Sequence, residues 1–253
     1  MTGIAVGADA SSLRYRAAIA ELPLTAWPDP AGPVVVVDGA AGWPERLVDA
    51  ADRAEALVLA EPVAVTAREL EDTARSVRVP VVVERRRRAA LPDRASVVAA
   101  LGSAAVVEVA LPAQDRDAWL RDALGWAGEV AGADAAVVAA DRAAHGVLAL
   151  LTGSRSIPVS LLASESAGPP LIELRTLAAE RLTMRVGSRH PAVWTADAGG
   201  ETRLPDRHES PERAALRRAV ALLADPEPAD EAEPADELAR LLRDERLRAA
   251  LGF

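Results

Sequence analysis

The sequence predicts an α/β protein in two parts: a parallel-sheet domain, then an α+β domain with an open-faced, mostly antiparallel sheet. Over the first 92 residues, short apolar runs alternate with helix-like segments, an order typical of parallel strands joined by helices. Beyond residue 93, four strand-like segments follow one another with short links, which indicates antiparallel pairing. Half of the residues are hydrophobic but only 3% are aromatic, which favours a layered core of Ala, Val and Leu.

The first domain is expected at residues 1–92 and contains three predicted helices between its strands. A helix capped by Ser11 or Ser12 runs to Ile19, and the helix that begins at Pro44 has its proline in the first turn. The predicted strands are Gly3–Gly7, Leu24–Trp27, Val34–Val37, Leu57–Ala60 and Val79–Val83, and the later helices are Pro44–Ala54 and Thr66–Val77.

The second domain is expected at residues 93–224, together with a C-terminal amphipathic helix at 237–251. Residues 225–236 form an acidic, proline-rich segment that is typical of a linker. The predicted helices are Asp115–Ala131, Ala135–Leu151 and Pro211–Leu223, and the predicted strands are Val106–Leu111, Pro158–Ser166, Leu171–Ala178, Arg181–Val186 and Ala192–Ala196.

One acid lies where chemistry is expected in a parallel sheet. Glu61 follows the apolar run Leu57–Ala60 and precedes Pro62, and proline pushes the residue before it out of the right-handed helical region. Ligands bind just outside the carboxyl ends of such strands. Glu61 is therefore a candidate site residue.

Composition excludes several classes of function. The net charge of −9 argues against binding to nucleic acid or to an anionic membrane. The chain has no cysteine and no apolar run of transmembrane length, and its N-terminus lacks the pattern of a signal peptide. No residue cluster has metal-ligand spacing. We therefore expect a cytoplasmic protein without a metal.

The strand-helix-strand unit from Leu57 to Val83 resembles the domain junction of the Gfo/Idh/MocA family of NAD(P)-dependent sugar and polyol dehydrogenases. In that family the first strand ends in Glu-Lys-Pro with a catalytic lysine, and the later strand begins Val-Pro, as Val79-Pro80 does here. The resemblance implies a Rossmann-like first domain, shortened because one strand-helix unit is missing between Trp27 and Val34. This chain has Glu61 at the lysine position and contains no lysine at all.

The resemblance also locates a cofactor site, with Gly7, Asp9, Ser12, Tyr15 and Asp38 as its candidate residues. Gly7 matches the first glycine of Gly-x-Gly-x-x-Gly, whereas Asp9 and Ser12 occupy the other two glycine positions. A charge at Asp9 would repel the pyrophosphate by roughly 4 kcal/mol at about 4 Å and an effective dielectric of about 20. We therefore expect no bound cofactor, or NAD(P) if the family activity survives.

Asp141 and His145 complete the candidate catalytic set with Glu61. Their spacing places them on one face of the predicted helix Ala135–Leu151, and it matches the family's Asp-x-Gly-x-His. A surface pair explains the same spacing.

Three functions remain open on this evidence. The first is a catalytically degenerate pseudoenzyme that acts as a binding or partner subunit. The second is an active NAD(P)-dependent oxidoreductase for a sugar-like or polyol-like substrate that uses His145, and the third is a cofactor-free lyase or isomerase that uses Glu61, Asp141 and His145. The resemblance implies a homodimer, or a hetero-oligomer with an active paralogue, through the open sheet, with Leu174, Leu177 and Met184 in its apolar patch.

Overall fold

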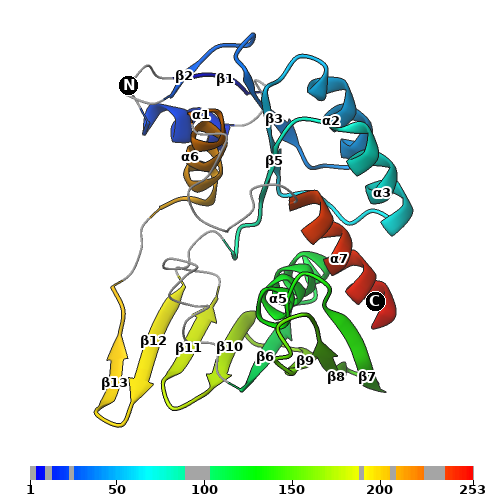
Figure 1. The fold of residues 1–253 in the computed structure, drawn as a ribbon, viewed down its shortest axis with the longest axis vertical. Helices are drawn as coiled ribbons and strands as arrows, with labels where there is room; N and C mark the ends of the chain where they lie inside the picture. Colours follow the sequence, from blue (N-terminus) through cyan, green and yellow to red (C-terminus); the bar gives the residue numbers. More distant parts are fainter. Residues whose placement is uncertain are drawn as a thin grey trace. The chain divides into compact units, whose positions relative to one another are not determined.

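The computed structural model describes residues 4–8, 13–22, 26–88, 103–187, 191–205, 209–224 and 237–252. The chain divides into two compact units (Figure 1). The first comprises Met1–Ala89 and Glu209–Leu242, and the second comprises Ala90–His208 and Arg243–Phe253. The expected linker at 225–236 lies outside the described residues.

The first unit contains a five-stranded sheet in the order β2-β1-β3-β4-β5, and all of its pairs are parallel. Strands β2 and β3 lie on either side of β1, and only five residues connect them, too few for the helical crossover that usually joins parallel strands of one sheet. The shortened Rossmann-like arrangement expected from the sequence is thereby confirmed. The strands are β1 (Ile4–Ala8), β2 (Ala26–Pro28), β3 (Val34–Asp38), β4 (Ala56–Ala60) and β5 (Val81–Glu84).

Helices cover both faces of this sheet. Alternate strand residues face opposite sides, so Val34, Val36 and Val58 pack with α1 and α6, whereas Val35 and Leu57 pack with α2 and α3. The helices are α1 (Leu13–Ala20), α2 (Trp43–Ala51), α3 (Ala67–Ser76) and α6 (Pro211–Ala224).

Helix α6 corrects the expected domain division. The sequence placed this segment in the second domain, but Ala215, Leu216 and Ala219 lie in the core of the first unit beside Tyr15 of α1. The chain therefore returns to its first unit after the second sheet. No local sequence pattern indicates this return.

Helix α7 (Glu237–Ala250) contributes to both cores. Leu238 and Leu241 belong to a core of the first unit, and Leu247 belongs to the core of the second. At its start, the Glu237 carboxylate accepts a hydrogen bond from the backbone N–H of Val83 in the edge strand β5 and forms an ion pair with Arg218. A side chain thus occupies part of the open edge of the parallel sheet.

The second unit contains an eight-stranded sheet in the order β13-β12-β11-β10-β6-β9-β8-β7. Only β6 and β9 pair in parallel, so the expectation of a mostly antiparallel sheet is confirmed. The strands are β6 (Ala104–Leu111), β7 (Ala136–Ala143), β8 (Gly146–Thr152), β9 (Val159–Glu165), β10 (Leu171–Leu177), β11 (Arg181–Val186), β12 (Ala192–Asp197) and β13 (Gly200–Arg203).

The helix predicted at Ala135–Leu151 is wrong. This segment forms β7 and β8, an antiparallel hairpin whose register shifts between Val137 and Ala139. Alanine-rich composition favours a helix locally, but pairing of β8 with β9 and burial of Val147, Ala149 and Leu151 stabilise strands instead. Strand β13 was not expected from the sequence either.

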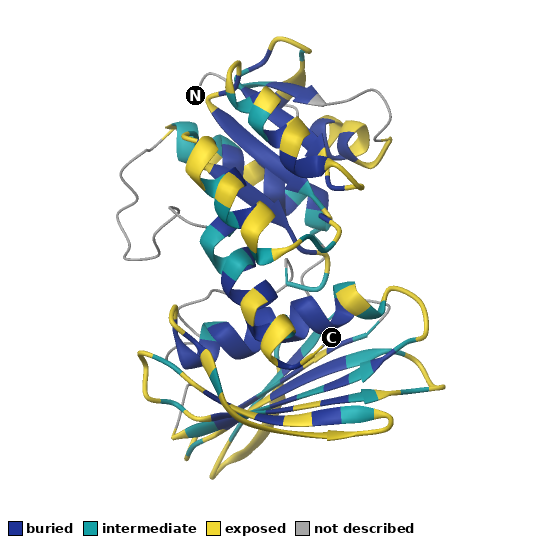
Figure 2. Ribbon diagram, turned by 90° about the vertical axis from the view of Figure 1, so that its right-hand side faces the viewer, coloured by how far each residue is buried: buried dark blue, intermediate teal, exposed yellow. Residues whose placement is uncertain are grey.

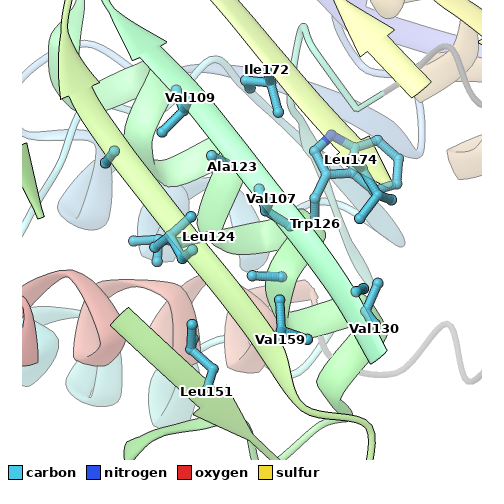
Figure 3. Packing of buried hydrophobic residues seen from close by; sticks show 14 of the residues in the cluster. Val107, Val109, Ala123, Leu124, Trp126, Val130, Leu151, Val159, Ile172 and Leu174 are labelled. Carbon is cyan, nitrogen blue, oxygen red and sulfur yellow. The ribbon is translucent and has the colours of Figure 1, made fainter. Parts of the chain in front are cut away.

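Helix α5 (Arg116–Ala131) covers one face of the eight-stranded sheet. Its buried side chains include Trp119, Leu124 and Trp126, which pack on alternate residues of β6, β8, β9 and β10 (Figure 3). Leu174 and Met184 are also fully buried in this core. The expectation that they form part of an open apolar patch is therefore wrong, whereas Leu177 is 46% exposed.

In the part of the chain that the structure describes, no helix is both long enough and apolar enough to span a membrane.

Replacement of Gly39 tests the tightest backbone approach in the first unit. A Cβ atom at this position would overlap the carbonyl oxygen of Ala60 and the backbone of Pro62. We expect Gly39→Ala to lower the free energy of unfolding by at least about 2 kcal/mol, because backbone must move. Urea denaturation measures the change. Gly187→Ala is the control, since its Cβ would meet only one atom at 3.9 Å; equal stability of the two variants would contradict the prediction.

Candidate functional site

A pocket of about 540 Å³ lies at the carboxyl ends of β3, β4 and β5 in the first unit. The first turns of α1 and α6 complete its wall. Open parallel sheets bind ligands at this edge. The lining residues are Leu13, Arg14, Tyr15, Val36, Asp38, Ala40, Ala60, Glu61, Val63, Glu84 and Glu212.

Two backbone hydrogen bonds tie together the loops that follow β3 and β4. Gly39 N–H donates to Ala60 O at 2.8 Å, and Val63 N–H donates to Gly39 O at 2.7 Å. The Trp43 indole N–H holds the second loop further by donating to Val63 O at 3.0 Å. The chain must therefore turn within Glu61 and Pro62.

The first of these loops has its own support. The Asp38 carboxylate accepts a hydrogen bond from Ala40 N–H at 2.9 Å. Arg46 of α2 donates to the carbonyl oxygens of Asp38, Ala40 and Ala41 at 2.8–3.0 Å. Asp38 thus lies in a fixed turn at the pocket.

Glu61 lies between two arginines. Its carboxylate is 3.0 Å from Arg14 and 3.5 Å from Arg86. Its φ of +41° is in the left-handed region, which costs an L-residue of this type on the order of 1 kcal/mol and often marks a functional position. Pro62 disfavours right-handed helical backbone at Glu61, as expected. The two loop hydrogen bonds fix the backbone on either side of the turn.

Glu84 and Tyr15 form a buried pair at the pocket. The Tyr15 hydroxyl donates to Glu84 Oε2 at 2.6 Å, and the two residues are 1% and 3% exposed. Burial raises the pKa of Glu84 to about 7. The hydrogen bond from Tyr15 lowers that pKa, whereas the negative charges of Glu61 and Glu212 raise it further. Burial, followed by the charge of Glu84, likewise raises the pKa of Tyr15.

Carboxylates outnumber cations in the pocket lining. Asp38, Glu61, Glu84 and Glu212 line it with Arg14 as the one cation among the lining residues. Arg14 is 3.0 Å from Glu61 and 3.9 Å from the buried Glu212. The pocket therefore favours positive charge over negative charge.

The structure brings together part of the expected cofactor set. Tyr15 and Asp38 line the pocket, as does Glu61 of the expected catalytic set. Gly7 lies within β1, where a Cβ would meet Pro30 O at 3.1 Å, so packing against the β2–β3 turn explains this glycine. Asp9 and Ser12 lie outside the described residues.

Asp141 and His145 do not share a helix face. Asp141 is an exposed residue of β7, opposite Leu148, and His145 lies in the turn before β8. His145 Nδ1 is 3.2 Å from the carboxylate of Glu165, which also pairs with Arg116 at 2.6 Å. Their catalytic role stays a prediction.

Three pocket residues were not singled out from the sequence: Arg14, Glu84 and Glu212. Glu84 ends the apolar run Val81–Val83 in the same way that Glu61 ends its own strand, so the strand-end signal was present. Of the arginines that follow Glu84, Arg85 is buried and Arg86 pairs with Glu61.

The first unit has a Rossmann-like fold with a pocket at the carboxyl ends of its parallel strands. No protein-family model and no curated protein sequence matches the chain significantly. Solved structures match it over its full length. The resemblance expected from the sequence is therefore confirmed as a resemblance in fold.

Two of these structures show the extent of the likeness. KijD10, a 3-ketoreductase from Actinomadura kijaniata in complex with NADP, has a TM-score of 0.67 at 17% identity, covering 98% of this chain and 96% of that chain. GnnA, a UDP-N-acetylglucosamine 3-dehydrogenase from Acidithiobacillus ferrooxidans, has a TM-score of 0.67 at 14% identity, covering 99% and 98%.

A lysine-to-glutamate variant of KijD10, in complex with TDP-benzene and NADP, also matches, with a TM-score of 0.65 at 18% identity over 98% of this chain and 96% of that chain.

The raised pKa of Glu84 predicts a pH-dependent stability. The folded protein keeps the Glu84 proton up to about pH 7, whereas the unfolded chain releases it near pH 4.5. Protonated Glu84 therefore stabilises the folded state fully below pH 4.5, and this stabilisation is lost as the pH rises through about 7. Between pH 4 and pH 8 this loss amounts to roughly 3 kcal/mol. Glu84→Gln removes the titrating group and should flatten that part of the profile.

Urea denaturation of both proteins at several pH values measures this effect. Glu55→Gln is the control, because Glu55 is exposed and lies outside the pocket. A Glu84→Gln profile parallel to that of the unchanged protein would show that Glu84 does not titrate in this range.

Proposed function

We propose that this chain is a catalytically degenerate relative of the dehydrogenases whose fold it shares, and that it acts as a ligand-binding or partner subunit. The observation that carries the proposal is the acidic lining of the strand-end pocket. A dinucleotide would bring the two negative charges of its pyrophosphate to this edge of the sheet. Four carboxyl groups line the pocket and disfavour that charge, and Arg14 is the one cation among the lining residues.

The lack of lysine supports the same proposal. The chain contains none, and arginine stays protonated in proteins, so it does not replace lysine as a proton donor. Glu61, at the strand position where the resemblance places the lysine, is engaged by Arg14 and Arg86. Those ion pairs hold the carboxylate in place at the pocket.

One observation favours the alternative of an active NAD(P)-dependent enzyme. The lysine-to-glutamate variant of KijD10 is a complex with NADP, so a glutamate in this fold is compatible with a bound dinucleotide. The proposal consequently depends on the rest of the pocket, namely Asp38, Glu84, Glu212 and the missing loop glycines, more than on Glu61.

Titration with NADPH and NADH tests the proposal. We expect no saturable change in nucleotide fluorescence below about 1 mM, which corresponds to a binding free energy weaker than about −4 kcal/mol. Glu61→Lys should not restore binding, because the remaining carboxylates still repel the pyrophosphate. Micromolar binding to the unchanged protein, or dehydrogenase activity in Glu61→Lys, would refute the proposal.

We propose that a second copy of the chain covers the outer face of the eight-stranded sheet. Helix α5 packs on one face, and no described element lies over the other (Figure 2). Val138, Leu148, Leu150 and Leu162 are 39–60% exposed on strands β7 to β9, and exposed apolar clusters of this kind mark protein interfaces.

The charges on that face suit a two-fold pairing. Glu173 is buried under Arg175 and Arg185, which both form ion pairs with it, and Arg175 also contacts Glu108 at 3.2 Å. Burial opposes ionisation, but the two arginines hold the pKa of Glu173 below its ordinary value. A copy related by a two-fold axis presents the same acids and arginines and is therefore self-complementary.

Charged substitutions on the outer face test the dimer. The double variant Leu148→Asp/Leu162→Asp places two carboxylates in the apolar cluster, and light scattering should show a monomer where the unchanged protein is a dimer. Thr202→Asp is the control, on an exposed strand position of the opposite face. A monomeric unchanged protein at micromolar concentration would contradict the proposal.

A further inference from the structure

We propose that the strand-end pocket of the first unit binds an organic ammonium ion with a short apolar chain, such as an alkyl diamine. This inference rests on the proposed function, because it requires that the pocket has lost its affinity for an anionic dinucleotide. It adds the chemical class of the ligand, which neither the fold nor the compared structures supply.

Charge is the first argument. The two arginines at the pocket both engage Glu61, and Arg14 also approaches Glu212. Asp38 bonds only to a backbone N–H of its own turn, and Glu84 bonds to a neutral tyrosine. These two carboxyl groups belong to the last residues of β3 and β5, on either side of β4. Neither forms an ion pair with an arginine among the described residues, and a diamine brings two cationic groups.

An incompletely bonded carboxyl group is the second and independent argument. Glu84 is 3% exposed, and its Oε1 has no hydrogen-bond partner in the part of the chain that the structure describes. A buried polar atom without a partner is costly and usually indicates a missing ligand, ion or water. Glu84 lines the pocket, so an ammonium N–H that enters the pocket supplies the missing donor.

The apolar part of the lining is the third argument. Leu13 is 74% exposed and Val63 is 46% exposed, although both line the pocket. Val36, Ala40 and Ala60 add apolar surface between the acids. A hydrated metal ion gains nothing from this surface, whereas the methylene groups of an alkyl amine lose contact with water against it.

Proton release follows from this binding mode. The groups that act on Glu84 are Tyr15 of α1, Glu61 after β4, Glu212 of α6 and Arg86 after β5. With a pKa of about 7, Glu84 is largely protonated at pH 6, and an ammonium ion beside it stabilises the ionised form. Binding should therefore release a proton, and affinity should increase by about tenfold from pH 6 to pH 8.

Isothermal titration with 1,4-diaminobutane at constant ionic strength tests the inference. We expect saturable binding at pH 8 with a dissociation constant below about 1 mM, and heats that vary with the ionisation enthalpy of the buffer. Glu84→Gln should weaken binding at least about tenfold, whereas the exposed control Glu55→Gln should leave it unchanged. Butane-1,4-diol, which has the same chain without charge, should not bind.

Several outcomes would overturn the inference: no saturable binding up to about 10 mM diamine, equal affinity of Glu84→Gln and the unchanged protein, or equal affinity for the diol. If Glu84→Gln does not fold, as judged by circular dichroism, Asp38→Asn must lower the affinity instead. Asparagine keeps the oxygen that accepts from Ala40 N–H and removes only the charge.

The NADPH titration separates this inference from the proposed function. Micromolar NADPH binding refutes the proposed function and with it this inference. A pocket that binds neither NADPH nor the diamine refutes this inference alone, and the proposed function stands.

Discussion

The close approach of the loops after β3 and β4 is the constraint on which the first unit's pocket depends. Gly39 leaves space for the backbone of Pro62, and its N–H and C=O groups bond on either side of the Glu61-Pro62 turn. With both ends of that turn fixed, Glu61 adopts positive φ and its side chain reaches Arg14 and Arg86. The absence of a side chain at Gly39 thus determines where the carboxylate of Glu61 lies, 22 residues further along the chain.

Electrostatics in this pocket differs from that of a site built on lysine. Arginine remains charged at every pH at which the protein is folded, so the cations beside Glu61 are permanent. Burial raises the pKa of Glu84 to about 7, so this carboxyl group can change its charge near neutral pH beside those permanent cations.

Much of the fold was predictable because local and global signals agree. Apolar runs, strand ends and proline positions place the elements of the first unit close to their observed limits. The hairpin of β7 and β8 was missed because apolar residues lie on both of its faces: Val147, Ala149 and Leu151 point to the core while Leu148 and Leu150 face solvent. Without polar alternation, strand and helix look alike.

The sequence predicted mainly those residues of the candidate site that stand at or just after the end of a strand. Asp38 and Glu61 follow apolar runs, and Glu84 carries the same signal, although it was not used. Arg14 and Glu212 come from helices nearly 200 residues apart in sequence and meet only through packing of α1 against α6. The pairing of Asp141 with His145 failed for the opposite reason, since it depended on a helical period that the segment does not adopt.

The Glu237 side chain on Val83 has a consequence for how the protein meets other chains. An open parallel sheet has two edges, where unpaired backbone groups can pair with a foreign strand. Here one edge is the three-residue β2, which ends in Pro28, and the other carries a carboxylate bonded to its backbone donor. Both features disfavour the addition of a foreign strand to the sheet and therefore oppose fibrous aggregation.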